Sequence, residues 1–226
     1  MKPNANNAKH AILFIWIALA LKLALFVSDL AQHGFPQSSA FFIFKVIKVK
    51  VRASTESTID ILLLIACIIA FTASAVFFLR WFKTAYHNLR QKIRYAGYSE
   101  GWAIGSWFIP ILNIFIPYQI MKEIYMETEN FLISRGYKIG RELTLGPVGW
   151  WWALWIISGI RISFSPSSGI LAVIAAIVGN IVFILLALVT IKVIKNYARI
   201  EPLLQQIDPQ PPHALPPPLL PLKAHS

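Results

Sequence analysis

The sequence is poor in acidic residues and in cysteine, and each shortage excludes a class of protein. Ten Asp and Glu stand against 21 Lys and Arg, and charged residues make up only 14% of the chain. Soluble domains carry about 25% charged residues, so an ordinary soluble domain is excluded. The single cysteine, Cys67, lies inside the apolar run ILLLIACIIAF. It has no partner for an internal disulfide and is expected to pack as a small hydrophobic side chain.

Motifs of common enzymes and nucleotide-binding proteins are also missing. The five histidines have no metal-ligand spacing, and no Walker, dinucleotide or nucleophile motif occurs. We therefore expect no catalytic residue, cofactor or metal ligand, and an intramembrane enzyme is the least favoured class. The net charge of +11 is not accompanied by a nucleic-acid-binding motif, so nucleic acid is not expected as a partner.

Long apolar runs are abundant instead. A membrane helix needs ~20 mainly apolar residues, and hydrophobic residues make up 57% of this chain. Four runs predict an all-α integral membrane protein with four transmembrane helices, at residues 11–28, 61–79, 143–160 and 169–191. No small-x-small cleavage site follows the first run before Asp29. That run is therefore expected to be an uncleaved anchor rather than a signal peptide.

A fifth apolar stretch, GWAIGSWFIPILNIFIPYQIMKE from Gly101 to Glu123, contains helix-breaking residues. Pro110 and Pro117 each lack a backbone donor, and Asn113 lies between them. Irregular backbone at membrane depth is tolerated only where protein or water satisfies it. We predict a re-entrant or interfacial segment at about 101–120, with a bend near 110–113, which leaves the membrane by the face it entered. A kinked fifth span is the alternative.

The distribution of basic residues favours four spans over five. Lys and Arg mark the cytoplasmic side of membrane proteins. With a cytoplasmic N-terminus, four spans place most of the Lys and Arg of this chain on that side, whereas five spans divide them more evenly. Both chain ends are therefore expected in the cytoplasm.

Two segments between the apolar runs have helical amphipathic patterns. Residues 80–95, RWFKTAYHNLRQKIRY, predict a basic amphipathic helix that lies against the membrane. Residues 118–133 repeat the spacing, with Glu123, Glu127 and Glu129 on a face expected to be solvated. The basic side chains expected to meet anionic lipid headgroups are Arg80, Lys83, Arg90, Lys92 and Arg94.

The end of the chain changes character and becomes rich in proline. The segment IEPLLQQIDPQPPHALPPPLLPLKAHS is unfavourable for helix and typical of an extended or disordered tail. The sequence therefore predicts one membrane domain over residues 1–200, followed by a Pro-rich disordered tail at 201–226.

Few polar residues lie within the predicted spans. Lys22 is the only charged one, and Asp60 begins the second span on the same side, so the two are candidates for an ion pair. Outward snorkelling of Lys22 is the alternative. Asn113 is expected to satisfy the broken backbone at the bend, and Asn180 to form an interhelical hydrogen bond.

The segments RWFKTAYHNL and GWAIGSWFIPILNIFIPYQIMKE, in this order, resemble a bacterial membrane family catalogued as domain of unknown function 4328. Its members carry the pattern W-x-x-x-A-x-x-N-L and then W-F-x-P-x-x-N-x-x-x-P-Y-Q-x-M-x-E. The resemblance covers roughly residues 60–195 and implies a multi-pass protein of the bacterial cytoplasmic membrane, without any established activity. The positions concerned, with the neighbouring Trp102, are Trp81, Ala85, Asn88, Leu89, Trp107, Phe108, Pro110, Asn113, Pro117, Tyr118, Gln119, Met121 and Glu123.

These patterns favour a non-catalytic membrane module. Its cytoplasmic basic and aromatic surface is expected to contact anionic lipid headgroups, a partner protein or another copy of the chain. A small transporter or channel that acts as an oligomer is the alternative. The spans offer few polar groups for a pathway, and no internal inverted repeat is visible.

Overall fold

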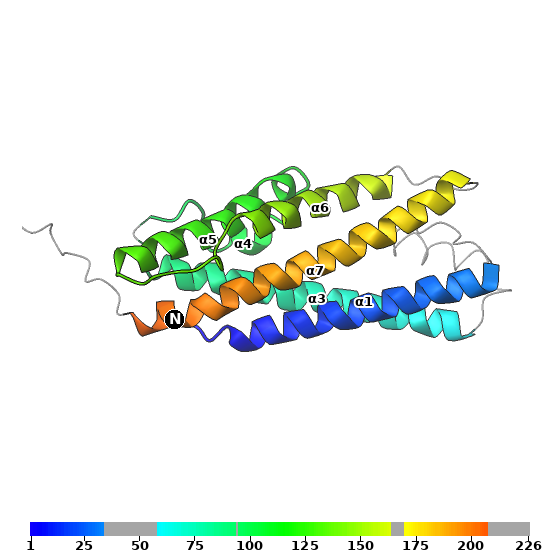
Figure 1. The fold of residues 1–226 in the computed structure, drawn as a ribbon, viewed down its shortest axis with the longest axis horizontal. Coiled ribbons are helices and arrows are strands. Elements are labelled where there is room, and N and C mark those ends of the chain that lie inside the picture. Colours follow the sequence, from blue (N-terminus) through cyan, green and yellow to red (C-terminus); the bar gives the residue numbers. More distant parts are fainter. Residues whose placement is uncertain (34–57, 94, 164–169, 208–226) are drawn as a thin grey trace, which may run out of the picture.

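The computed structural model describes residues 1–33, 58–93, 95–163 and 170–207, and within these ranges every regular element is helical. Figure 1 shows that these elements form one elongated bundle. They are α1 (Ala5–His33), α3 (Thr58–Arg90), α4 (Trp102–Gly105), the 3-10 turn η1 (Leu112–Ile114), α5 (Ile116–Ser134), α6 (Gly146–Ser163) and α7 (Ile170–Gln206).

The helices α1, α3, α6 and α7 run along the bundle in alternating directions (Figure 1). Helix α1 packs on α3 and α7, and α6 packs on α7. The first residues of the chain and the last turns of α7 therefore lie at the same end (Figure 1). We call this end, formed by residues 1–11, 80–93, 118–142 and 193–207, the polar end.

Three of the described helices are long and apolar enough to cross a membrane. The qualifying segments are Ala5–Ser28, Ile61–Arg90 and Val173–Leu204. Large apolar side chains are exposed along them, for example Val27, Leu62 and Ile174, which are 61%, 60% and 50% exposed. Such surface is unfavourable in water and favourable in lipid. Helix α6, rich in Trp and Gly, has 18 residues and is not among the three.

The predicted break in the fifth apolar stretch is present. Helix α4 ends at Gly105, and α5 begins only at Ile116. Between them the backbone forms single turns, with the Asn113 amide donating to the Ile109 carbonyl at 2.8 Å. The chain reaches α4 from the polar end, and α5 runs back toward that end (Figure 1). Pro110, which has no backbone donor, lies inside this irregular stretch.

Local sequence explains both ends of α5. Pro117 lies in its first turn, where its missing N–H group costs no helical hydrogen bond. The helix ends before Gly136, whose φ of 82° is unfavourable for residues with a Cβ atom. The Gly136 and Tyr137 amides donate to the carbonyls of Ile133 and Leu132 at 2.9 and 3.0 Å, which is the hydrogen-bond pattern of a Schellman motif.

Residues 80–90 of the basic amphipathic segment are helical, as predicted, but the expectation that their apolar face lies against the membrane is wrong. Residues 80–90 continue α3 without interruption. Their apolar stripe is fully buried in the protein core, against α1, α5 and α7, rather than facing lipid. Helical spacing identifies a stripe that must be covered, but not whether lipid or protein covers it. The stripe consists of Trp81, Phe82, Ala85, Tyr86 and Leu89.

The boundary predicted at residue 201 lies too early, because α7 continues through Pro202 to Gln206. A proline inside a helix removes one hydrogen bond and crowds the preceding turn. Burial offsets this cost, since Glu201 and Leu204 are 3% and 0% exposed and Ile207 also packs in the core. Residues 208–226, the rest of the predicted tail, lie outside the described residues.

Candidate functional site

A buried carboxyl group lies at the centre of the polar end. Glu201, on α7, is 3% exposed. The side-chain amide of Asn4 donates to its two oxygens at 3.1 and 3.0 Å, and that of Asn88 donates at 2.8 Å. Three segments far apart in the sequence therefore meet at one acceptor group. Hydrogen bonds of this kind are necessary because burial of an unpaired carboxyl group is costly.

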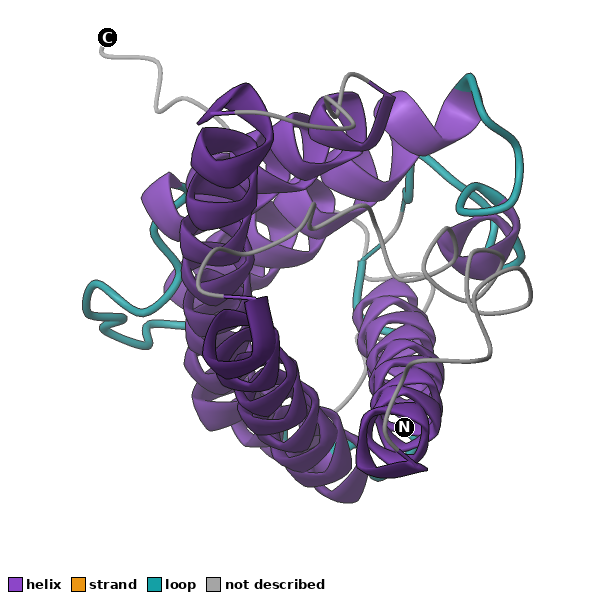
Figure 2. Ribbon diagram, turned by 90° about the vertical axis from the view of Figure 1, so that its right-hand side faces the viewer, coloured by secondary structure: helices purple, strands orange, loops and turns teal. Residues whose placement is uncertain are grey.

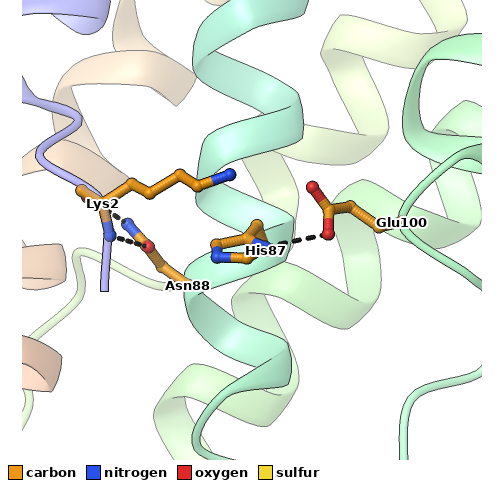
Figure 3. Close-up of polar contacts among 4 residues, drawn as sticks. All are labelled: Lys2, His87, Asn88 and Glu100. Carbon is orange, nitrogen blue, oxygen red and sulfur yellow. Dashed lines mark hydrogen bonds and ion pairs between the residues drawn. The ribbon is translucent and has the colours of Figure 1, made fainter.

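The N-terminal segment is held by further hydrogen bonds. The Asn4 side-chain amide donates to the Trp81 carbonyl at 3.2 Å, and the backbone carbonyl of Asn4 accepts from the Ala8 amide in the first turn of α1. Asn88 pairs with the backbone of Lys2 in both directions, accepting from its N–H at 2.8 Å and donating to its carbonyl at 2.9 Å (Figure 3). The chain start is thus part of the packed structure.

An ion pair lies beside this network, toward the surface. His87, next to Asn88 on α3, contacts the Glu100 carboxylate through Nδ1 at 2.9 Å (Figure 3). The hydrogen bond with His87 holds the pKa of Glu100 below its ordinary value of 4.5. Figure 3 shows the Lys2 side chain extending toward α3 and the same pair.

The loop between α3 and α4 is fastened to α3 and α5. The Tyr86 hydroxyl lies 3.0 Å from a carboxylate oxygen of Glu123 and accepts from the Tyr98 amide at 3.0 Å. The Gly97 amide donates to the other Glu123 oxygen at 2.7 Å. Glu123 is therefore not simply a solvated acid, as the sequence led us to expect, but holds the loop in place. The Tyr98 hydroxyl also donates to Gln119.

Aromatic rings fill the centre of the bundle next to the polar end. Trp107 lies in edge contact with Phe78 and Trp155, at centroid distances of 5.7 and 5.9 Å. Trp152 stacks on Trp155 at 4.9 Å, and Tyr118 stacks on Trp152 at 6.0 Å. These contacts join α3, α5 and α6 with the broken segment, residues 106–115 between α4 and α5. We call this group of rings the aromatic cluster. Such pairs stabilise beyond their buried area.

A buried tyrosine pair links α5 to α7. The Tyr125 hydroxyl donates to the Val193 carbonyl at 2.7 Å, and its ring lies 6.1 Å from that of Tyr197. Burial raises the pKa of Tyr125, so it remains a protonated donor at neutral pH. Both side chains are fully buried.

The predicted family positions divide into a buried, a partly buried and an exposed group. Asn113 and Tyr118 are partly buried, and Glu123 and Trp107 likewise. The buried group holds the core of the polar end together and comprises Trp81, Ala85, Asn88, Leu89, Pro117 and Met121. The exposed group lies on or beside the broken segment and comprises Trp102, Phe108, Pro110 and Gln119.

The predicted basic residues lie around the outside of α3. Arg80 and Arg90 are exposed, and Lys83 is partly exposed. Lys92 donates from Nζ to the carbonyl of Ile207, so it ties the end of α7 to α3. Arg94 lies outside the described residues.

Lys22 and Asn180, polar residues of the predicted spans, lie on different helices, α1 and α7. Lys22 is partly buried on α1, whereas the side chain of Asp60 lies outside the described residues, so their pairing stays a prediction. The Asn180 amide donates to the Ala176 carbonyl of its own helix at 2.9 Å, rather than to a neighbouring helix. Among the described residues, no group of three His, Cys, Asp or Glu side chains is arranged to hold a metal ion.

Sequence reasoning missed Asn4 and Glu201, the two residues that complete the buried network. A signal for Glu201 was present, because Val193, Tyr197 and Leu204 continue the apolar helical spacing past Pro202. Asn4 had a weaker signal, as a capping residue in front of the first apolar run.

The arrangement as a whole is a rigid, cross-linked end of a helical bundle with a basic exterior. A comparison with family models finds a match over residues 48–199, more than half of the chain, to the family described as Domain of unknown function (DUF4328). No curated protein matches the chain, and no solved structure does. The matched range includes the buried Trp81 and Asn88, the broken segment and the aromatic cluster. The chain therefore belongs to the DUF4328 family.

Proposed function

We propose that the chain is a non-catalytic module of the bacterial cytoplasmic membrane, whose basic polar end binds anionic lipid headgroups at the cytoplasmic face. A partner protein that presents acidic groups is the other ligand of this class. The observation that carries the proposal is the division of the molecule into a basic, internally hydrogen-bonded end and a long apolar remainder.

A four-span arrangement with a re-entrant segment accounts for this division. In it α1, α3, α6 and α7 cross the membrane, and residues 101–115 enter and leave on the cytoplasmic side. It is supported by the course of the chain, which reaches α4 from the polar end and returns there through α5 (Figure 1). Phe108 and Ile111, in the irregular stretch, are each 72% exposed, which suits contact with lipid.

The charges of the polar end support a site for anions. Exposed Arg80 and Arg90 lie on α3 just beyond its apolar part, with Lys122 on α5 and Arg135 and Arg141 after it. Three acidic groups at this end form hydrogen bonds inside the protein: Glu201 with two side-chain amides, Glu123 with the loop before α4, and Glu100 with His87. Each basic residue close to an anionic membrane contributes roughly 1 kcal/mol of attraction.

The aromatic residues at or beside the polar end divide between its surface and its core. Tyr95 and Tyr137 are 79% and 38% exposed, whereas Trp81, Phe82 and Tyr86 are fully buried. These three buried side chains hold the last turns of α3 in the core. The exposed Arg80 and Arg90 lie on the same helix and are therefore held in place with it.

Lipid retention by the purified full-length chain tests the proposal. Native mass spectrometry would compare bound phosphatidylglycerol with bound phosphatidylcholine. The double variant Arg80→Glu and Arg90→Glu reverses two charges and is expected to lower phosphatidylglycerol retention by about tenfold or more. The matched control, Arg80→Lys with Arg90→Lys, keeps both charges and is expected to retain the lipid.

Equal phosphatidylglycerol retention in the two double variants would contradict the lipid proposal. If a protein that co-purifies with the native chain is lost from the glutamate variant while lipid retention is unchanged, the surface serves a partner protein instead. Saturable solute flux in vesicles that contain only this chain would favour the alternative, a small transporter or channel.

Cysteine labelling in a Cys67→Ser background tests the arrangement in the membrane. We expect Asn130→Cys, exposed on α5, to react with a membrane-impermeant maleimide only from the cytoplasmic side. Ile170→Cys, exposed at the opposite end of the bundle, should react only from outside. Reaction of both positions from one side would contradict the four-span topology.

A further inference from the structure

A cavity of about 320 Å³ lies inside the bundle, beside the aromatic cluster. Its walls come from α1, α3, α6 and α7, together with Trp107 of the broken segment. Figure 2, which looks along the bundle, shows how these long helices stand around the interior. The volume falls at the lower end of the ~300–1,000 Å³ typical of small-molecule sites. It is roughly twice that of an engineered apolar cavity that binds benzene.

The walls of the cavity carry no charge. They are formed by aromatic rings and aliphatic side chains, among them Phe71, Trp151 and Phe183. The polar side-chain groups of the lining residues are three hydroxyl groups and the indole N–H groups of three tryptophans. A carboxylate or phosphate would have to enter this space without a cation to pair with it. The cost of burying an unpaired charge excludes such ligands.

The three hydroxyl groups accept hydrogen bonds but have no proton left to donate. Ser74 donates to the Phe71 carbonyl at 2.8 Å, Ser158 to that of Trp155 at 2.7 Å and Thr190 to that of Leu186 at 2.6 Å. Each oxygen keeps lone-pair capacity. The polar part of a ligand therefore fits these hydroxyl groups best if it supplies a donor, as an alcohol does.

The cavity is also accessible from its surroundings. It is partly open rather than enclosed, and Phe71 in its wall is 44% exposed. In the membrane arrangement proposed above, its entrance meets the acyl chains of the bilayer. A molecule that reaches the cavity by this route is apolar over most of its length.

We propose that this cavity is a binding site for an uncharged lipid that carries a single acyl chain and a hydroxyl-bearing head, such as a monoacylglycerol. The acyl chain lies among the aromatic walls, and the head donates to the hydroxyl oxygens of Ser158 and Thr190. The site is distinct from the basic polar end and needs none of its arginines. It requires only that the chain resides in a membrane.

Fluorescence quenching of the full-length chain in detergent tests this site, because Trp107, Trp151 and Trp155 all line the cavity. The probe is a monoacylglycerol with bromine atoms on its acyl chain. We expect saturable quenching, reversed by an excess of the unbrominated monoacylglycerol. Quenching that does not saturate, or is not reversed, would overturn the proposal without the need for any variant.

Two glycines of α6 give a matched pair of variants. A Cβ atom added at Gly159, which lines the cavity, or at Gly149, which does not, meets no atom within 4 Å. Both changes replace a helical glycine, so neither is expected to weaken the helix. Gly159→Leu is expected to abolish saturable quenching by filling the cavity, and Gly149→Leu to leave it unchanged. Equal quenching in both variants would overturn the site.

The chemistry of the head is tested separately. The double variant Ser158→Ala and Thr190→Val removes the acceptors, and we expect roughly two- to tenfold weaker binding of the monoacylglycerol. Binding of a brominated alkane should not change.

At pH 8, a brominated fatty acid should bind the native chain at least roughly tenfold more weakly than the monoacylglycerol. Equal binding of the fatty acid would overturn the uncharged class. The variant Arg80→Glu with Arg90→Glu should bind the monoacylglycerol normally, which separates this site from the basic surface.

Discussion

At the scale of single residues, Glu201 is the most consequential side chain of the polar end. It accepts hydrogen bonds from Asn4 and Asn88 while it is 3% exposed. Removal of an acceptor from a buried network leaves its donors without partners, which costs more than the hydrogen bonds themselves contributed. The stability of this end therefore depends on one carboxyl group that three segments share.

We expect Glu201→Ala to lower the free energy of unfolding by about 2–4 kcal/mol, because two buried amides lose their acceptor. Glu201→Gln keeps one acceptor oxygen and should have a smaller effect. Thermal unfolding of the detergent-solubilised chain measures both. Gln206→Ala, exposed near the end of the same helix, is the control and should change little. Equal unfolding temperatures for Glu201→Ala and this control would contradict the role given to Glu201.

The His87–Glu100 contact predicts a dependence on acid. The pKa of Glu100 is lower in the folded chain than its ordinary value of 4.5, so the stabilising contribution is fully present above that value. It is lost as the pH falls through the lower folded pKa. Unfolding temperatures of the native chain and Glu100→Gln should thus differ at pH 5.5 and converge toward pH 3. A difference that grows on acidification would contradict this sign.

At the scale of helices, the last turns of α3 and α7 depend on each other. Lys92 donates to the Ile207 carbonyl, and the apolar stripes of both segments share one core. Propensity alone does not favour helix around Pro202. Tertiary packing of Leu204 and Ile207 therefore maintains the last turn of α7.

Truncation tests this dependence. A chain that ends after Ile207 keeps every described contact and should unfold at the temperature of the full-length chain. A chain that ends after Ile200 loses Glu201, Leu204 and Ile207 and should be destabilised by at least about 4 kcal/mol, judged from the burial of two aliphatic side chains and an acceptor. Equal thermal stability of the two truncated chains would show that the last turns contribute nothing.

The sequence predicted the helices better than the packing between them. The four apolar runs predicted the positions of α1, α3, α6 and α7. Pro110 and Asn113 predicted the break before α5. The buried network was not predicted, because Asn4, Asn88 and Glu201 are separated by up to 197 residues and meet only in three dimensions. Sequence periodicity also does not distinguish lipid from protein as the cover of an apolar stripe, which is why the end of α3 was misplaced.

At the scale of the whole molecule, the position of the broken segment relative to the bilayer has a measurable consequence. In the proposed arrangement Ile111, which is 72% exposed, lies in lipid. We expect Ile111→Lys to cost roughly 2.5–3.5 kcal/mol of membrane insertion if it lies at depth. The measurement is the amount of membrane-extracted, folded protein at equal synthesis.

Ile133→Lys supplies the comparison for this change. Ile133 is 56% exposed near the end of α5, at the polar end, where a lysine remains in water or among headgroups. Its yield should equal that of the native chain. Equal yields of the two lysine variants would mean that residue 111 does not reside in the hydrocarbon.

The contact between Asn4 and Glu201 also orders the events of biosynthesis. Asn4 leaves the ribosome 197 residues ahead of its acceptor Glu201, which lies near the end of α7. Until Glu201 has been made, the amides of Asn4 and Asn88 have no carboxyl group to bind, and the first two long helices lack the closing element of their core. Completion of the polar end thus coincides with the arrival of the last turns of α7, so a chain interrupted earlier carries an unfinished end that cellular proteases can recognise.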